Sequence, residues 1–279
     1  MNKNPIEHLR HSLAHLLGAA VLELYPGSKL AIGPAIEGGF YYDIDFSSVT
    51  EVRGTTRKDT RIDAEKSITI SDSDLPKIEK KMREILKTWK GFTGREVSAE
   101  EAKNIFKGNP YKEELIAELE KTNQPITIYY SGPKIKAPTP QELEIENCLP
   151  AGEAGKLKIG FLDLCRGGHV ENAKDINPKA FKLSHVAGAY WRGDEKNPQL
   201  TRIYGLAFAT KDELQKHLTM LEEAKKRDHK KLGVELDLFT FSDLVGSGLP
   251  LWTPKGTILR NILDDFVWEL RKKNGYMQV

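Results

Sequence analysis

Two pairs of side chains in this sequence are of types that bind metal ions or move protons. The first pair is His11 and His15, and the second is Cys165 and His169. Within each pair the spacing is four residues, and the pairs lie so far apart in the sequence that only a folded chain could bring them together. Either pair alone is a weak signal, whereas both pairs in a chain with only two cysteines are a much sharper one.

Residues 5–25 have the apolar periodicity of a helix, with Pro5 at its first position. His11 and His15 fall on the side opposite the apolar face, one helical turn apart, so their rings are directed at one volume. This position predicts that both rings lie outside the apolar core. The alternative to a functional site is that both are simply solvated.

The second pair follows a predicted strand. Phe161–Cys165 reads as a short strand, and Arg166–Gly168 as a tight turn that presents His169. Together with the two earlier histidines, these side chains could form a tetrahedral zinc site. They could equally form a metal-free cluster that positions a water molecule and moves its proton. Both readings remain open at this point.

The composition is that of a globular protein. The 279 residues leave room for one large or two medium domains, and 39% of them are hydrophobic and 29% charged. No apolar run is long enough to span a membrane, and the N-terminus lacks the apolar core of a secretory signal. We therefore expect a cytoplasmic protein without a disulfide between Cys148 and Cys165.

The net charge of +2 does not indicate a nucleic-acid binder, so any RNA contact must come from local patches. The most basic window is residues 225–231, at the end of a predicted helix. These cations either contact phosphates or only complement the helix dipole.

The remaining pattern mixes helices with short strands. Further helices are predicted over 73–90, 99–106, 110–120, 211–231 and 257–273, and strands around 31–32, 40–46, 181–185, 190–192 and 201–209.

The arrangement of His11, His15, Cys165 and His169 resembles that of the editing domain shared by threonyl- and alanyl-tRNA synthetases. Further segments that resemble the threonyl branch are Ala31–Pro34, Gly39–Asp43, Ala187–Asp194, Arg202–Gly205, Arg227–Gly233 and Leu236–Phe239. Residues 246–273 also resemble the first signature of class II synthetases. The resemblance covers nearly the whole chain.

This resemblance implies an α+β chain in which the editing domain packs helices on an antiparallel sheet. Its main lobe would span 1–158, with polar insertions at 47–73 and 131–158. The segments that would follow are a second additional subdomain over 159–210, a linker helix over 211–232 and a truncated start of the class II catalytic core over 233–279. We expect the later ATP-binding signatures to lie beyond residue 279, so the chain resembles the front portion of a threonyl-tRNA synthetase.

The resemblance also implies a reaction, the hydrolysis of seryl-tRNA(Thr) that the synthetase has mischarged. His11 and His15 would handle the water and the leaving hydroxyl, and Cys165 and His169 would complete the pocket. Asp163 would hold a histidine or the seryl amine. Cys165 as a covalent nucleophile is the less favoured alternative, because an ester needs only an activated water.

Two further residues match substrate-binding positions of that family. Tyr42 could equally be a strand aromatic that packs on the sheet, and Lys112 a solvated charge on a Glu-rich helix. One departure is Gly168, where the family usually has proline. We expect this glycine to loosen the turn before His169.

The implied partners are tRNA(Thr) and, for the whole enzyme, a second copy of the chain, with no membrane. Editing would require no cofactor. Zinc binding is possible because these four side chains resemble the zinc ligands of the alanyl branch, whereas threonyl relatives edit without zinc. ATP, Mg²⁺ and the Zn²⁺ of the threonine pocket would belong to the missing core. The alternatives are a free-standing trans-editing hydrolase of the alanyl or threonyl type and an inactive RNA-binding or zinc-stabilised module.

Overall fold

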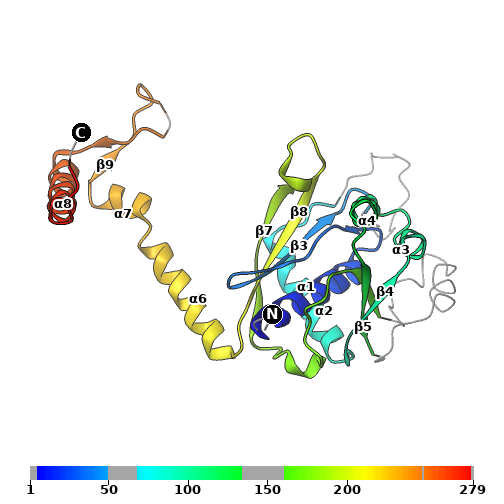
Figure 1. The fold of residues 1–279 in the computed structure, drawn as a ribbon. Helices are drawn as coiled ribbons and strands as arrows, with labels where there is room; N and C mark the ends of the chain where they lie inside the picture. The colour runs from blue at the N-terminus through cyan, green and yellow to red at the C-terminus, as the bar shows by residue number, and fades with distance from the viewer. Residues whose placement is uncertain (1–4, 50–67, 134–159, 247, 278–279) are drawn as a thin grey trace, which may run out of the picture. The chain divides into compact units, whose positions relative to one another are not determined.

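The computed structural model describes residues 5–49, 68–133, 160–246 and 248–277, shown as a coloured ribbon in Figure 1. The chain divides into two compact units, Met1–Leu214 and Gln215–Val279. Helices and antiparallel strands alternate in the first unit, which confirms the α+β class. Most of both polar insertions, and Cys148 with them, lie outside the described residues.

Helix α1 (Pro5–Leu24) is the element around which the first unit is built (Figure 1). It contacts helix α2, strands β2 and β3 of one sheet, and strand β6 of another. Because these neighbours cover several sides of the helix, every residue from Ser12 to Val21 is buried. The expectation that His15 lies outside the core was therefore wrong, since only 1% of its surface is exposed.

The larger sheet is antiparallel and five-stranded, and it combines segments that are distant in the sequence. The strand order is β1-β3-β8-β7, with β2 paired to β3. Its strands are β1 (Lys29–Leu30), β2 (Ala35–Ile36), β3 (Gly39–Asp45), β7 (Phe181–Tyr190) and β8 (Gln199–Ala207). β8 pairs with β3 from Gly39 opposite Leu206 to Ile44 opposite Thr201, so residues 181–207 complete a sheet that residues 29–45 begin.

Two predicted strands of this sheet are corrected. The strand expected around 31–32 lies at Lys29–Leu30, although the Ala31 amide still donates to the Asp43 carbonyl and the Ile32 carbonyl accepts from the Asp43 amide, both at 2.9 Å. The strand expected at 190–192 is the end of β7, followed by a 3-10 turn over Trp191–Gly193 in which Arg192 has φ +56°.

The smaller sheet is also antiparallel, in the order β4-β5-β6. Its strands are β4 (Gly91–Val97), β5 (Ile126–Gly132) and β6 (Phe161–Leu164). β6 confirms a prediction, but β4 and β5 were missed. β4 contains two glycines and two charged residues, so it shows no alternation of apolar and polar positions.

The further α-helices among the described residues of the first unit are α2 (Leu75–Leu86), α3 (Ala99–Ile105) and α4 (Pro110–Lys121). Ser98 caps α3 by accepting a hydrogen bond from the Glu101 amide, as the sequence predicts. Asn109 caps α4 by accepting from the Lys112 amide, and its Nδ2 donates to the Leu30 carbonyl at 2.9 Å. This second bond fixes the first turn of α4, which carries Lys112, against β1.

Helix α6 (Lys211–Lys226) runs from the end of the first unit into the second, which also holds α7 (His229–Glu235), β9 (Phe239–Thr240), β10 (Leu251–Trp252) and α8 (Pro254–Lys273). The linker helix predicted over 211–232 is two helices. Asp228 interrupts it with φ −58° and ψ 121°, and its side chain accepts from the Lys230 amide to begin α7. Among the described helices, none combines the length and apolarity needed to cross a bilayer.

Candidate active site

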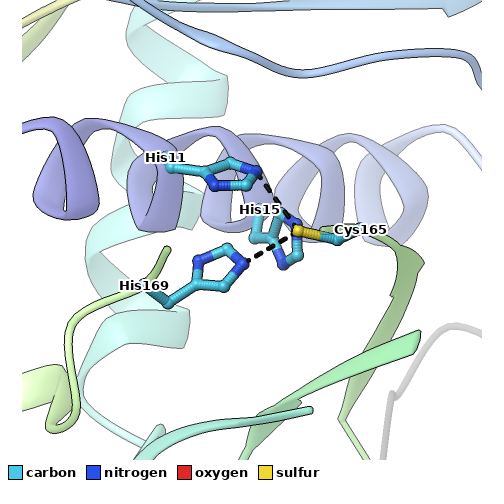
Figure 2. Close-up of side chains that lie close together, drawn as sticks. All are labelled: His11, His15, Cys165 and His169. Atoms are coloured by element: carbon cyan, nitrogen blue, oxygen red, sulfur yellow. Dashed lines mark hydrogen bonds between the residues drawn. The ribbon is translucent and has the colours of Figure 1, made fainter. Parts of the chain in front are cut away.

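The structure brings both residue pairs to one place, as Figure 2 shows. Cys165 Sγ lies 3.4 Å from His11 Nε2 and 3.2 Å from His169 Nε2. One ligand-type atom from each of the four residues lies within 4.8 Å of the others. The cluster therefore joins helix α1 to the end of strand β6.

A two-glycine turn places the second pair. Cys165 directly follows β6, and its amide donates to the Thr127 carbonyl at 3.0 Å. Gly167 and Gly168 then have φ values of +86° and +89°, a region that favours glycine. The Gly167 amide also donates to Cys165 Sγ at 3.2 Å. Proline, with φ near −65°, could not adopt the backbone seen at Gly168.

The His169 ring is held by neighbouring rings. Phe92 stacks against it with a centroid separation of 5.1 Å, and His11 with a separation of 4.2 Å. Burial, reinforced by the nearby His15, His11 and His8 rings, lowers the pKa of His169 far below its ordinary value. The ring is therefore neutral at physiological pH.

Asp163 is the centre of a second, more deeply buried group. Its Oδ1 lies 2.5 Å from Lys112 Nζ, and its Oδ2 accepts from the Tyr42 hydroxyl at 2.5 Å. His15 Nε2 lies 3.5 Å from the same Oδ2. Lys112 is thus a paired internal cation rather than a solvated charge.

The environment of this group shifts two pKa values in opposite directions. Burial, and then the nearby His11 and Lys112 side chains, lower the pKa of His15 well below its ordinary value. Burial, and then the Asp163 carboxylate, raise the pKa of Tyr42 well above its ordinary value. Both side chains are consequently neutral across the physiological range.

A cavity of about 440 Å³ opens beside these two groups. Four of the sequence-predicted site residues line it: His11, Lys112, Asp163 and Cys165. The other three do not line the cavity but contact residues that do: His169 contacts Cys165, and His15 and Tyr42 contact Asp163. The site therefore has an inner layer of neutral, buried rings and an outer layer of groups that can reach a ligand.

The donor set of the four-residue cluster suits a zinc ion in chemical kind, with three imidazoles and one thiol. Tetrahedral ligands at the usual zinc distances are roughly 3.3–3.6 Å apart. The 3.4 Å spacing of Cys165 Sγ to His11 Nε2 lies within this range, and the 3.2 Å spacing to His169 Nε2 is slightly shorter than it. His15 is turned elsewhere, because its Nδ1 lies 3.5 Å from Ser131 Oγ and its Nε2 faces Asp163. Cys165, His11 and His169 lie close to zinc-ligand spacing, and His15 would have to turn to complete the set.

Sequence reasoning missed several residues that contact the site rings. Ser12 Oγ lies 3.2 Å from His169 Nδ1, Ser131 lies beside His15, and Phe92 stacks on His169. Phe92 belongs to β4, which shows no alternation, and Ser131 lies near the end of β5, which was also not predicted. The only sequence signal for Ser12 was its position directly after His11.

Comparison with known proteins agrees with this geometry. Residues 156–204 match the family model of the threonyl and alanyl tRNA synthetase second additional domain. The chain is 45% identical over 272 residues to a threonine–tRNA ligase of Rubrobacter xylanophilus, covering 97% of this chain and 35% of the ligase. It is 43% identical over 267 residues to one of Borreliella burgdorferi, covering 96% and 38%.

A threonine–tRNA ligase of Porphyromonas gingivalis is 45% identical over 271 residues, covering 96% of this chain and 34% of the ligase. The chain thus spans little more than a third of the length of the relatives it matches, while nearly all of its own length is matched. The second additional domain, the four-residue cluster and the extent of these matches agree. Over nearly its whole length, the chain is similar to a portion of threonyl-tRNA synthetases, and it includes the match to the second additional domain.

Proposed function

We propose that the cavity beside His11 and Asp163 hydrolyses the ester of seryl-tRNA(Thr), and so corrects mischarging. The observation that carries this proposal is the convergence of His11, Lys112, Asp163 and Cys165 on one cavity. A basic ring, a carboxylate paired with an ammonium group and a thiol are together suited to bind a cationic aminoacyl group and activate water.

The chemistry requires one water and two proton movements. The water oxygen attacks the ester carbonyl carbon while His11, which lines the cavity, accepts its proton. The bond between the carbonyl carbon and the ribose oxygen then breaks, and that oxygen takes up a proton. The products are serine and uncharged tRNA.

Asp163 is placed to recognise the seryl amine. A carboxylate has about four lone-pair positions, and Lys112, Tyr42 and His15 occupy at most three of them. Because Asp163 also lines the cavity, it retains capacity to accept a hydrogen bond from a ligand ammonium group. Lys112 and Tyr42 in turn hold the carboxylate in one orientation.

The need for such a site follows from the size of the two amino acids. Serine lacks one methyl group of threonine, and a pocket gains only about 1–3 kcal/mol from a single such group. A second site that admits the smaller amino acid and rejects the larger one supplies the missing discrimination.

A bound zinc ion would be held by Cys165, His11 and His169, with His15 turned toward them, and would polarise the carbonyl or the water. The roles of His11 and Asp163 in hydrolysis do not depend on it.

The relatives are threonine–tRNA ligases, and we propose that the whole protein of this chain likewise joins threonine to tRNA, with ATP and Mg²⁺ and as a homodimer. In this proposal the basic residues 225–231 contact the tRNA backbone, since the Lys226, Arg227 and Lys231 side chains are largely exposed.

The test is deacylation of seryl-tRNA(Thr) and threonyl-tRNA(Thr) by the purified chain. We expect the seryl ester to be hydrolysed and the threonyl ester to be largely retained. His11→Ala should lower the rate by on the order of 10²-fold, because it removes a proton-transfer group. His185→Ala is the matched control: it removes an exposed imidazole of the same unit that does not line the cavity.

Other outcomes would assign a different function. Equal hydrolysis of both esters would place the selectivity elsewhere, and hydrolysis of alanyl- or seryl-tRNA regardless of the tRNA would favour a free-standing trans-editing enzyme. Binding of tRNA without hydrolysis would favour an RNA-binding module.

A further inference from the structure

Ser12 makes three polar contacts. It lies on α1, directly after His11 in the sequence, and 0% of its surface is exposed. Its hydroxyl donates to the His8 carbonyl at 2.8 Å and accepts from the Val170 amide at 3.1 Å. Its third contact is with His169 Nδ1, at 3.2 Å.

The Ser12 hydroxyl has a single proton, and the position of that proton decides whether Ser12 donates to His169 Nδ1 or accepts from it. A serine hydroxyl has one proton and two lone pairs. The Val170 amide can only donate and the His8 carbonyl can only accept. The hydroxyl proton lies on the shorter contact, toward His8, as helical serines commonly place it on the carbonyl one turn earlier. The remaining lone pair of Ser12 therefore faces His169 Nδ1, which must carry a hydrogen to make the contact favourable.

The opposite edge of the ring agrees with this assignment. A neutral imidazole with its hydrogen on Nδ1 has an unprotonated Nε2. His169 Nε2 lies 3.2 Å from Cys165 Sγ, so the thiol hydrogen can bond to that lone pair. Cys165 Sγ also accepts from the Gly167 amide at 3.2 Å, and of the two ring nitrogens beside the sulfur, His169 Nε2 at 3.2 Å is nearer than His11 Nε2 at 3.4 Å.

We propose that Ser12 is a positioning residue that keeps His169 in the Nδ1–H tautomer and so directs the Nε2 lone pair at the Cys165 thiol. Stacking against Phe92 and His11 holds the ring plane, and Ser12 determines which nitrogen carries the hydrogen. The thiol is then held as a neutral group whose hydrogen points away from the water that His11 activates. This catalytic consequence rests on the proposed hydrolysis, whereas the tautomer itself does not.

The tautomer can be measured directly on the whole chain. A long-range ¹H–¹⁵N correlation spectrum of the ¹⁵N-labelled protein distinguishes a protonated ring nitrogen from an unprotonated one. A His169→Gln spectrum identifies the signals, recorded at roughly pH 8, above the ordinary histidine range. We expect Nδ1 to be protonated and Nε2 unprotonated in the unaltered protein. A proton on Nε2 would overturn the proposal without the use of any Ser12 variant.

Variants then test whether Ser12 is the cause. Ser12→Ala should shift His169 toward the Nε2–H form or a mixture, and Ser12→Thr, which keeps the hydroxyl, should restore the Nδ1–H form. Ser28→Ala is the matched control, because Ser28 is also buried and also donates to a nearby carbonyl, that of Tyr25 at 2.7 Å. An unchanged His169 tautomer in Ser12→Ala would show that Ser12 does not determine it.

The rate of seryl-tRNA(Thr) hydrolysis is a separate measurement. We expect Ser12→Ala to lower kcat by roughly tenfold with little change in KM, and Ser12→Thr to recover most of the loss. If the unaltered chain hydrolyses no seryl-tRNA(Thr), the proposed function fails, and the spectra still decide the tautomer.

Discussion

Lys112 Nζ lies 2.5 Å from Asp163 Oδ1, and the two side chains are only 3% and 5% exposed. The lysine lies in the first turn of α4 and the aspartate in β6, so the pair joins two elements that are far apart in the sequence. Because water is excluded, each charge depends on the other for stabilisation. The pair also forms part of the cavity wall, which links the stability of the fold to the site.

Replacing Lys112 with methionine should therefore destabilise the fold strongly. The Asp163 carboxylate would remain buried without its cation, and removal of one partner from such a pair costs about 3–5 kcal/mol. Urea unfolding of the variant measures this loss.

Lys103→Met is the matched control for that experiment. Lys103 also pairs with a carboxylate, Glu120 at 2.7 Å, but the two side chains are 48% and 50% exposed. An exposed pair contributes less than about 1 kcal/mol. Equal losses in the two variants would contradict the importance of burial.

Stability should fall as the pH falls through the ordinary histidine range. His15 and His169 have lowered pKa values in the folded state because they are buried, so below about pH 6.5 the unfolded chain binds more protons. Each ring then contributes a slope of about 1.4 kcal/mol per pH unit, with stability present above that pH and lost below it. Unfolding free energies measured between about pH 5 and pH 7 test this, because that range brackets the pKa of histidine in the unfolded chain.

His15→Gln should reduce the slope of unfolding free energy against pH by the contribution of one histidine, whatever the substitution does to stability at neutral pH. His229→Gln is the control, because the His229 side chain is 84% exposed. A slope unchanged by His15→Gln would mean that His15 takes up a proton in the folded protein.

Cys165→Ser separates a metal-free site from a zinc site. If the thiol only lines the cavity and bonds to His169, serine preserves the shape and a hydrogen-bonding group. We expect the variant to keep hydrolysis within about tenfold of the unaltered chain, and a chelator to have no effect. Loss of activity in the variant, together with loss on chelation and recovery with added zinc, would contradict this and establish a zinc requirement.

Gly168→Ala should damage the site more than the fold. At φ +89° an alanine is strained by about 1 kcal/mol, and relief of that strain would move the adjacent His169. We expect a modest fall in Tm and a larger fall in hydrolysis of the seryl ester. Gly108→Ala, at φ +86° with nothing within 4 Å of the added carbon, should cost similar stability without the loss of hydrolysis.

The sequence by itself determined which residue types could do chemistry and the elements that carry most of them. The helix over α1, the cap at Ser98 and the strand before Cys165 follow from local patterns, because caps and periodicity depend on neighbours in the chain. Resemblance in segments spread along the chain was enough to predict the family.

Tertiary structure alone decided how deeply each group is buried and what it touches. His15 lies on the polar side of its own helix, yet β6 and the rest of the unit cover that side, so it is buried. Strand β4 was not predicted because its glycines and charged residues break the local alternation, whereas β5 does alternate over Ile126–Ile128 and the prediction missed it. The pairing of Lys112 with Asp163, and the hydrogen bond of Ser12 with His169, exist only because long-range contacts exclude water from both places, and no local pattern records that exclusion.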